Sequence, residues 1–138
     1  MEIEKYNTEP RELVISIRDL YKSFGNNHVL QGINLDVSKE ENVVVLGRSG
    51  SGKSVLIKII CGLLKPDSGK VNVLGEEVDH LKAKGLQALR LKVGFSFQNS
   101  ALYDSMTVRE NLEFPLLRNA RHLSKKEVAA QIESVLDD

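Results

Sequence analysis

The chain has 138 residues, a length that suits one domain and hardly two. With 41% hydrophobic and 28% charged residues, its composition is that of a soluble globular protein, which argues against disorder and against a fibrous repeat. Its 19 basic and 19 acidic side chains balance, so no net positive charge is available to hold a nucleic-acid backbone, and we expect no nucleic-acid partner.

The single cysteine and the pattern of hydropathy narrow the class of protein further. Cys61 alone cannot form an internal disulfide or a cysteine-rich zinc site. The first residues are polar and acidic, unlike a secretory signal, and no apolar run approaches the roughly 20 residues that span a bilayer. These features predict a cytoplasmic protein.

The first predicted elements are two strands, followed by a change of pattern. Apolar and polar residues alternate over 13–18 and again over 33–37, which predicts two half-buried strands that pair antiparallel through a turn at 25–27. The continuous β-branched run at 43–46 instead predicts a central strand covered on both faces. From Ser54 onward, apolar residues on all sides predict a buried helix that Pro66 stops.

The second half of the chain is predicted to be mainly helical. It begins with a short strand at 71–73, an amphipathic helix around 81–90 and a strand at 93–98. Thr107 and Ser124 each stand three residues before a glutamate, the spacing of a capping box, and so predict two more helices. Pro115 is expected to interrupt or end the first of them.

A glycine-rich motif between the predicted central strand and the first helix indicates the chemistry. Residues 47–54, GRSGSGKS, match the pattern G-x-x-x-x-G-K-[ST] of the phosphate-binding P-loop. Gly50 and Gly52 allow successive N–H groups to turn inward as an anion nest, and the helix dipole points at the same anion. Lys53 then places its charge on the terminal phosphates, and Ser54 offers its hydroxyl to Mg²⁺. The motif therefore predicts the phosphates of a nucleotide and Mg²⁺ as ligands.

The order of features from 13 to 117 resembles the ATP-binding cassette (ABC) ATPases. The segments 17–25 and 29–35 look like the first two strands of that family, and 61–69 looks like its helix end and hairpin. The segment 93–98 is similar to the strand that leads into the Q-loop. The resemblance implies an α/β fold with a P-loop NTPase core, whose parallel sheet is incomplete, an N-terminal antiparallel β subdomain, and the start of a helical subdomain.

The resemblance also implies a domain layout within the one domain. By this match the antiparallel β subdomain comprises 12–40 and 69–75, the nucleotide-binding core comprises 41–68 and 92–98, and the start of the helical subdomain is 99–138.

Individual residues receive roles from the same resemblance. Phe24 occupies the position of the aromatic that stacks on adenine, and Gln98 that of the amide that reaches Mg²⁺ and the attacking water. Lys53 and Gln98 are therefore the expected catalytic residues, and Ser54 and Gln98 the expected metal contacts. The expected nucleotide-binding set is Phe24, Gly47, Ser49, Gly50, Ser51, Gly52, Lys53, Ser54 and Val55.

The partners follow from the segment after Gln98. Residues 101–112 resemble the start of the helical subdomain that meets a membrane permease, so we expect a permease subunit there, a second ATPase subunit in a dimer, and a peripheral location at the inner face of the cell membrane. Together with 114–116, this segment is most similar to the ATPases of bacterial lipid-trafficking transporters of the Mla type, which work with MCE-class proteins. A generic ABC subunit with another cargo remains an equal alternative.

Several family elements have no counterpart in the sequence. A signature loop of LSGGQ type and a D-loop are absent, and no histidine stands where the switch histidine would follow a Walker B strand. Residues 134–138 end in two acids, as Walker B does, but they continue an amphipathic pattern and predict a helix end. The chain thus resembles the N-terminal part of a longer ABC ATPase. We expect weak Mg-nucleotide binding, negligible turnover, and marginal stability or self-association through unpaired strand edges.

Three other interpretations stay open. One is a soluble ABC protein of DNA repair or translation, which the balanced charge and the resemblance at 101–117 count against. Another is a small-molecule kinase, which does not need the predicted antiparallel pair before its P-loop. The third is a nucleotide-binding fragment without catalysis. For a complete protein, the resemblance implies ATP hydrolysis coupled to transport.

Overall fold

The computed structural model describes residues 12–96, 102–119 and 123–136. The chain divides into two compact units, Met1–Phe95 and Ser96–Asp138, and each is described by itself.

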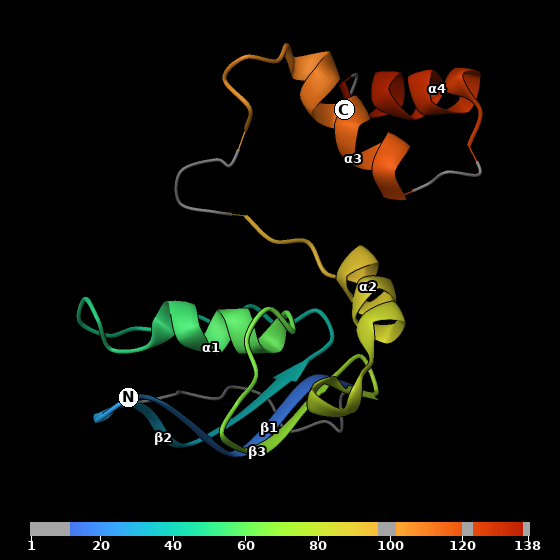
Figure 1. The fold of residues 1–138 in the computed structure, drawn as a ribbon. Coiled ribbons are helices and arrows are strands. Elements are labelled where there is room, and N and C mark those ends of the chain that lie inside the picture. The colour runs from blue at the N-terminus through green and yellow to red at the C-terminus, as the bar shows by residue number, and fades with distance from the viewer. Residues whose placement is uncertain (1–11, 97–101, 120–122, 137–138) are drawn as a thin grey trace. The chain divides into compact units, whose positions relative to one another are not determined.

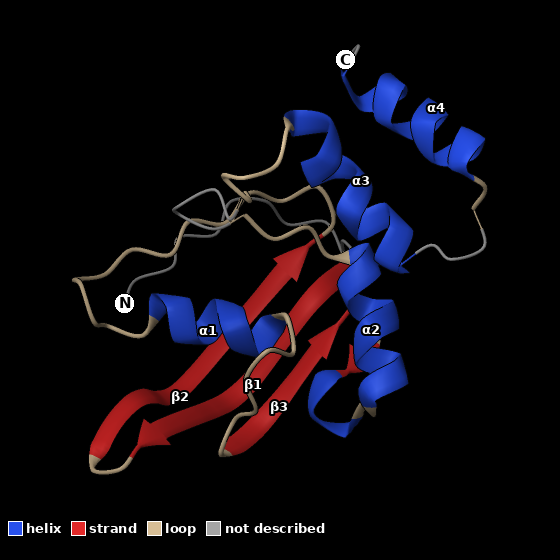
Figure 2. Ribbon diagram, turned by 45° about the horizontal axis from the view of Figure 1, so that its top comes forward, coloured by secondary structure: helices blue, strands red, loops and turns tan. Residues whose placement is uncertain are grey.

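A four-stranded antiparallel sheet forms the base of the first unit (Figure 2). Strands β1 (Leu13–Phe24) and β2 (Asn27–Ser38) pair through a two-residue turn, which confirms the predicted antiparallel pair. Strand β3 (Ser68–Val73) pairs with the other edge of β1, and the short β4 (Glu76–Glu77) completes the order β2-β1-β3-β4.

Helix α1 (Lys53–Ile60) lies across one face of this sheet and supplies much of the core (Figure 1). Its Leu56 and Ile59 are 2% and 0% exposed, and they pack with buried residues of the strands, namely Ile17, Leu20, Leu30, Leu35, Val71 and Val73. The prediction that α1 is buried all round is wrong, because Ile57 on its outer side is 41% exposed. Helix α2 (Ala83–Lys92) follows a 3-10 turn at Val78–His80 and adds Leu89 to the core, as predicted.

Helix α1 ends earlier than predicted, at Ile60 rather than at Pro66. Gly62 adopts a left-handed conformation with φ 63°, and its N–H donates to the carbonyl oxygen of Ile59 at 2.9 Å. This is the turn by which glycine commonly ends a helix. Arg90 of α2 then donates to the carbonyl oxygens of Cys61 and Gly62, so the negative end of the helix dipole has a cationic partner.

Two predicted strands are not formed among the described residues. The segment 43–46 has no ladder hydrogen bonds, and Val44 and Leu46 are each 75% exposed. Residues 93–96 are likewise outside any strand, and residues 97 and 98 lie outside the described residues. A strand exists only through a neighbour, and every pairing in the described part of the chain is antiparallel and belongs to the β1–β4 sheet.

Helices α3 (Val108–Asn119) and α4 (Lys125–Leu136) form the second unit. Both predicted capping boxes are present, because Thr107 and Glu110 exchange hydrogen bonds, as do Ser124 and Glu127. Pro115 lies inside α3 and does not end it. The predicted helix at 134–136 is the end of α4.

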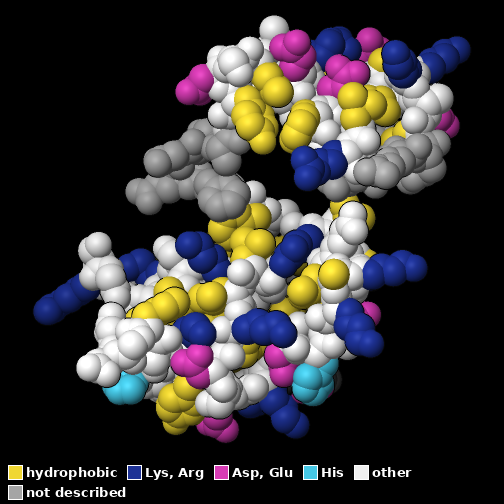
Figure 3. Space-filling model, in the orientation of Figure 1, with side chains coloured by type: hydrophobic (Ala, Val, Ile, Leu, Met, Phe, Trp, Pro, Cys, Tyr) yellow, Lys and Arg dark blue, Asp and Glu magenta, His cyan; other side chains and the backbone are white. Residues whose placement is uncertain are grey.

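The surface of the second unit is partly apolar (Figure 3). Within the described ranges, three of its large hydrophobic residues are more than 60% exposed, namely Leu102, Val108 and Val135. None of the helices in those ranges has both the length and the hydropathy required to cross a bilayer.

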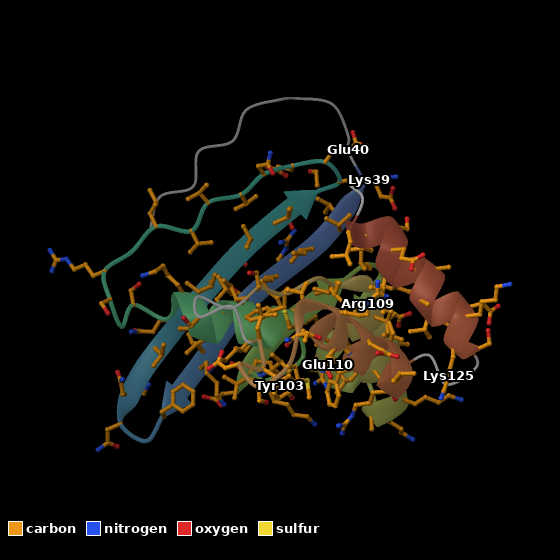
Figure 4. All side chains as sticks on the ribbon, turned by 90° about the horizontal axis from the view of Figure 1, so that it is seen from above. Lys39, Glu40, Tyr103, Arg109, Glu110 and Lys125 are labelled. Carbon is orange, nitrogen blue, oxygen red and sulfur yellow. The ribbon has the colours of Figure 1, made fainter. Side chains whose placement is uncertain are left out.

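Acidification is expected to loosen the start of α3, where Glu110 lies (Figure 4). Hydrogen bonds from the backbone N–H and the hydroxyl of Thr107 hold the pKa of Glu110 below its ordinary value. Because the folded-state pKa is the lower one, the capping box stabilises α3 above the ordinary carboxyl range and loses this effect as the pH falls through the folded value. Amide hydrogen exchange at the start of α3, followed through the acid range, measures the loss.

The substitution Glu110→Gln should remove that component of the pH dependence. Glu113→Gln, on the same helix, changes the net charge equally and should leave the acid transition in place. Identical acid profiles for the two variants would contradict the role of the capping box.

Candidate functional site

Residues 47–52 form a loop that leads directly into α1. Gly52 is the N-cap of the helix with φ 96°, and Gly50 has φ 79°, so both occupy the left-handed region that glycine tolerates. A Cβ atom at Gly52 would lie 2.9 Å from side-chain atoms of Leu30 and Val29 of β2, whereas one at Gly50 would meet nothing within 4 Å. The end of the loop is therefore pressed against β2, and its middle is open.

Backbone donors of the loop are available to a ligand. Ser51 N–H donates to the carbonyl oxygen of Arg48 at 3.2 Å, and Leu56 N–H makes the first bond of the helix, to Gly52 at 2.9 Å. In the part of the chain that the structure describes, the N–H groups of Gly50, Gly52 and Lys53 have no backbone acceptor. Free N–H groups of this kind, beside the positive end of the α1 dipole, are what an anion nest requires.

The ammonium group of Lys53 lies at the beginning of the same loop. Its Nζ donates to the carbonyl oxygens of Gly47 at 2.6 Å and Arg48 at 2.8 Å, and an ammonium has three donors, so one remains for a phosphate oxygen. The loop thus combines a fixed positive charge with open amides, which fits the triphosphate of a nucleotide.

Mg²⁺ has a more limited set of protein ligands here. Ser54 in the first turn of α1 is exposed, and its hydroxyl is the protein oxygen that the motif offers. Across residues 12–96, 102–119 and 123–136, no three His, Cys, Asp or Glu side chains gather as a metal site. This donor set fits Mg²⁺, which commonly keeps waters and substrate phosphates as most of its ligands.

The other predicted binding residues surround this loop. Ser49 is exposed, Ser51 is exposed beside Gly47, and Val55 is half-buried on α1. A cavity of ≈ 220 Å³ lies between the loop and β2, and Val29 and Ile33 are among its apolar lining.

Phe24, the predicted adenine-stacking residue, lies at the end of β1 with its side chain 50% exposed. In the β1–β2 register Phe24 is opposite Asn27 and Lys22 is opposite Leu30, the residue against which Gly52 rests. The hairpin that carries Phe24 thus contacts the end of the loop through Val29 and Leu30 of β2. Gln98 lies outside the described residues, and its role stays a prediction.

Sequence reasoning did not single out three side chains that hold the sheet and helix α1 behind this loop. Lys22 bonds to Asp67, and Arg90 caps the end of α1. Each contact joins residues far apart in the sequence, so no local pattern indicates it.

Comparison with known proteins agrees with the predicted family. The family model described as ABC transporter matches residues 30–138. The chain is 38% identical over 129 residues to the chloroplastic protein TRIGALACTOSYLDIACYLGLYCEROL 3 of Arabidopsis thaliana, covering 91% of this chain and 36% of that protein. It is 40% identical over 124 residues to the methionine import ATP-binding protein MetN of Mesorhizobium japonicum. This match covers 90% of this chain and 33% of that protein. The chain spans about a third of the length of these relatives.

Solved structures show the same architecture. A dimeric structure of the ATP-binding cassette MJ0796, in a post-hydrolysis state bound to ADP and Pi, has a TM-score of 0.76 and 31% identity over 89% of this chain and 56% of that one. The structure of cbiO1 from Clostridium perfringens, part of the ABC transporter complex cbiONQ, has a TM-score of 0.78 and 27% identity. It covers 92% of this chain and 50% of that chain. The α/β fold class predicted from the sequence is thereby confirmed.

Proposed function

Because the chain belongs to the ABC transporter family, we propose that it binds MgATP at the loop 47–54 and serves as the ATP-binding subunit of a transporter. The observation that carries the proposal is the arrangement at the start of α1, where the Lys53 ammonium bonds to the beginning of the loop and, among the described residues, the amides of Gly50, Gly52 and Lys53 have no backbone acceptor. ATP hydrolysis coupled to membrane transport is the activity proposed for the whole protein.

Four residues of the motif at 47–54 have a defined part in this proposal. The amides of Gly50, Gly52 and Lys53 bind phosphate oxygens, and the Lys53 ammonium balances the charge of the terminal phosphates. The Ser54 hydroxyl would hold Mg²⁺, and the ion would supply positive charge to the bound phosphates. Gln98 is proposed to contact the metal and to orient the water.

The proposed partners are a membrane permease and a second ATPase subunit. The MJ0796 cassette is described as dimeric, and cbiO1 as part of a transporter complex, which supports both partners. The permease is proposed to bind the segment after Gln98 and so to hold the protein at the inner face of the membrane. Exposed apolar side chains at Leu102 and Val108 support a protein contact there.

A lipid is the proposed cargo. The proposal is supported by the resemblance of 101–117 to lipid-trafficking ATPases and by the Arabidopsis relative, whose name contains that of a glycolipid, trigalactosyldiacylglycerol. Other relatives are named for the import of methionine and of sulfate or thiosulfate, and these cargoes are the alternatives that a transport assay must include.

Calorimetric titration of the intact chain with ATP, in the presence of Mg²⁺, tests the nucleotide-binding step. We expect saturable binding that competes with ADP and weakens when Mg²⁺ is chelated. If no binding is seen although the chain is folded by circular dichroism, the proposed function fails at its first step. Co-purification with a permease then tests the transporter assignment.

A further inference from the structure

Asp67 ties the chain after α1 to the end of strand β1. Its Oδ1 accepts a hydrogen bond from Lys22 Nζ at 2.6 Å, and its Oδ2 accepts one from the Ser23 N–H at 2.6 Å. Its own N–H donates to the carbonyl oxygen of Tyr21 at 3.0 Å. One residue thus holds three consecutive residues of β1 through charge-assisted and backbone bonds, and Lys22 is only 14% exposed at its side chain.

The same Lys22 ammonium lies over the ring of Phe24. Its Nζ is 5.5 Å from the ring centroid, within the range of a cation–π contact. The contact spans the irregularity in the β1–β2 register between Lys22 and Ser23, so regular strand alternation does not produce it. Phe24 is 50% exposed, so a large part of the residue remains accessible although Lys22 lies over one side of its ring.

We propose that Lys22 and Asp67 are positioning residues that hold the Phe24 ring as a one-sided platform for the purine base of the bound nucleotide. Asp67 fixes the Lys22 ammonium, the ammonium backs one face of the ring, and the base stacks on the other face. The inference rests on the proposed function, because the base reaches the ring only when the P-loop holds the phosphates.

Asp67 lies between helix α1 and the end of strand β1. The residue stands at the end of the short connection from α1, whose N-terminus forms the phosphate cradle, and it bonds directly to the strand that carries Phe24. The ion pair therefore joins the chain that follows α1 to the end of the strand that carries the ring.

A pair of ligands separates positioning of the base from general damage to the fold. ATP uses both the loop and the ring, whereas inorganic tripolyphosphate uses the loop alone. We expect Lys22→Met and Asp67→Asn each to weaken ATP binding about three- to tenfold, in calorimetric titration of the intact chain, while the affinity for tripolyphosphate is unchanged. Lys22→Arg should bind ATP like the parent, because a guanidinium also pairs with carboxylates and lies on aromatic rings. Lys70→Met, on the same sheet, is the matched control for loss of charge and should bind both ligands normally.

A fluorescence measurement gives an independent signal from the ring. The chain contains no tryptophan, so Phe24→Trp introduces a single indole at the platform. Its emission should change on addition of ATP and stay constant on addition of tripolyphosphate, and Lys22→Met in that background should shift the ATP titration to higher concentration.

Three results would overturn the inference. Equal losses for ATP and tripolyphosphate would show a merely structural role, and unchanged ATP affinity in both variants would show no role. Tighter ATP binding by Lys22→Met would show that the ammonium covers the face that the base needs. Failure of the parent chain to bind either ligand would instead refute the proposed function itself.

Discussion

Replacing Lys53 with alanine should lower the affinity for MgATP by roughly one to two orders of magnitude. A hydrogen bond to a charged group contributes about 1.5–3 kcal/mol, and each 1.4 kcal/mol is a factor of ten in affinity. Alanine also removes the bonds from Nζ to the carbonyl oxygens of Gly47 and Arg48, which hold the beginning of the loop. Calorimetric titration with ATP in the presence of Mg²⁺ measures the change.

Lys58→Ala is the matched control, because Lys58 is an exposed lysine on the same helix, in its last turn. It should bind ATP like the parent chain. Parental affinity in the Lys53→Ala variant would show that this lysine does not contact the phosphates.

Replacing Gly52 with alanine should both abolish nucleotide binding and destabilise the first unit. A left-handed conformation costs an L-residue about 1–2 kcal/mol, and a Cβ atom here would also lie 3.1 Å from the backbone oxygen of Val29 as well as against the side chain of Leu30. Because crowding of a packed site adds about 1–3 kcal/mol, the free energy of unfolding should fall by about 2–5 kcal/mol in urea denaturation.

Gly50→Ala separates the two effects. Its φ is also left-handed, but a Cβ atom there meets nothing within 4 Å, so the loss of stability should be limited to about 1–2 kcal/mol. The added methyl group would still project from the middle of the cradle and should weaken phosphate binding. Equal stability of the two alanine variants would contradict the packing of the loop end against β2.

Local patterns explain the parts of the fold that the sequence could predict. The hairpin follows from alternating side chains that put Ile17 and Leu35 into the core, and the helix starts follow from capping boxes at Thr107 and Ser124, where donor and acceptor are three residues apart. The loop at 47–54 was also predictable, because its conformation depends on its own glycines.

Features that depend on distant residues were not predictable in the same way. The run at 43–46 has the composition of a central strand, but a strand needs a neighbour, and the described residues provide none for it. Helix α1 ends before the predicted stop at Pro66 because Gly62 provides a left-handed turn nearer to the helix.

The ion pair near the candidate site was not predictable from the sequence for the same reason. Lys22 and Asp67 are 45 residues apart in the chain, and only the packing of the α1 connection on the sheet brings them together. Their opposite charges alone could not have identified the pair among 19 basic and 19 acidic residues.

The two carbonyl contacts of Lys53 have a consequence for the thermodynamics of binding. A long flexible side chain loses rotamer freedom when a ligand immobilises it, at a cost of about 0.5–1.5 kcal/mol. Here the carbonyl oxygens of Gly47 and Arg48 already restrain the ammonium, so much of that entropy is lost as the chain folds rather than when the anion arrives. A phosphate therefore binds to an ammonium group that needs little further ordering. The enthalpy of binding should be dominated by the replacement of water around the phosphate by amide and ammonium donors.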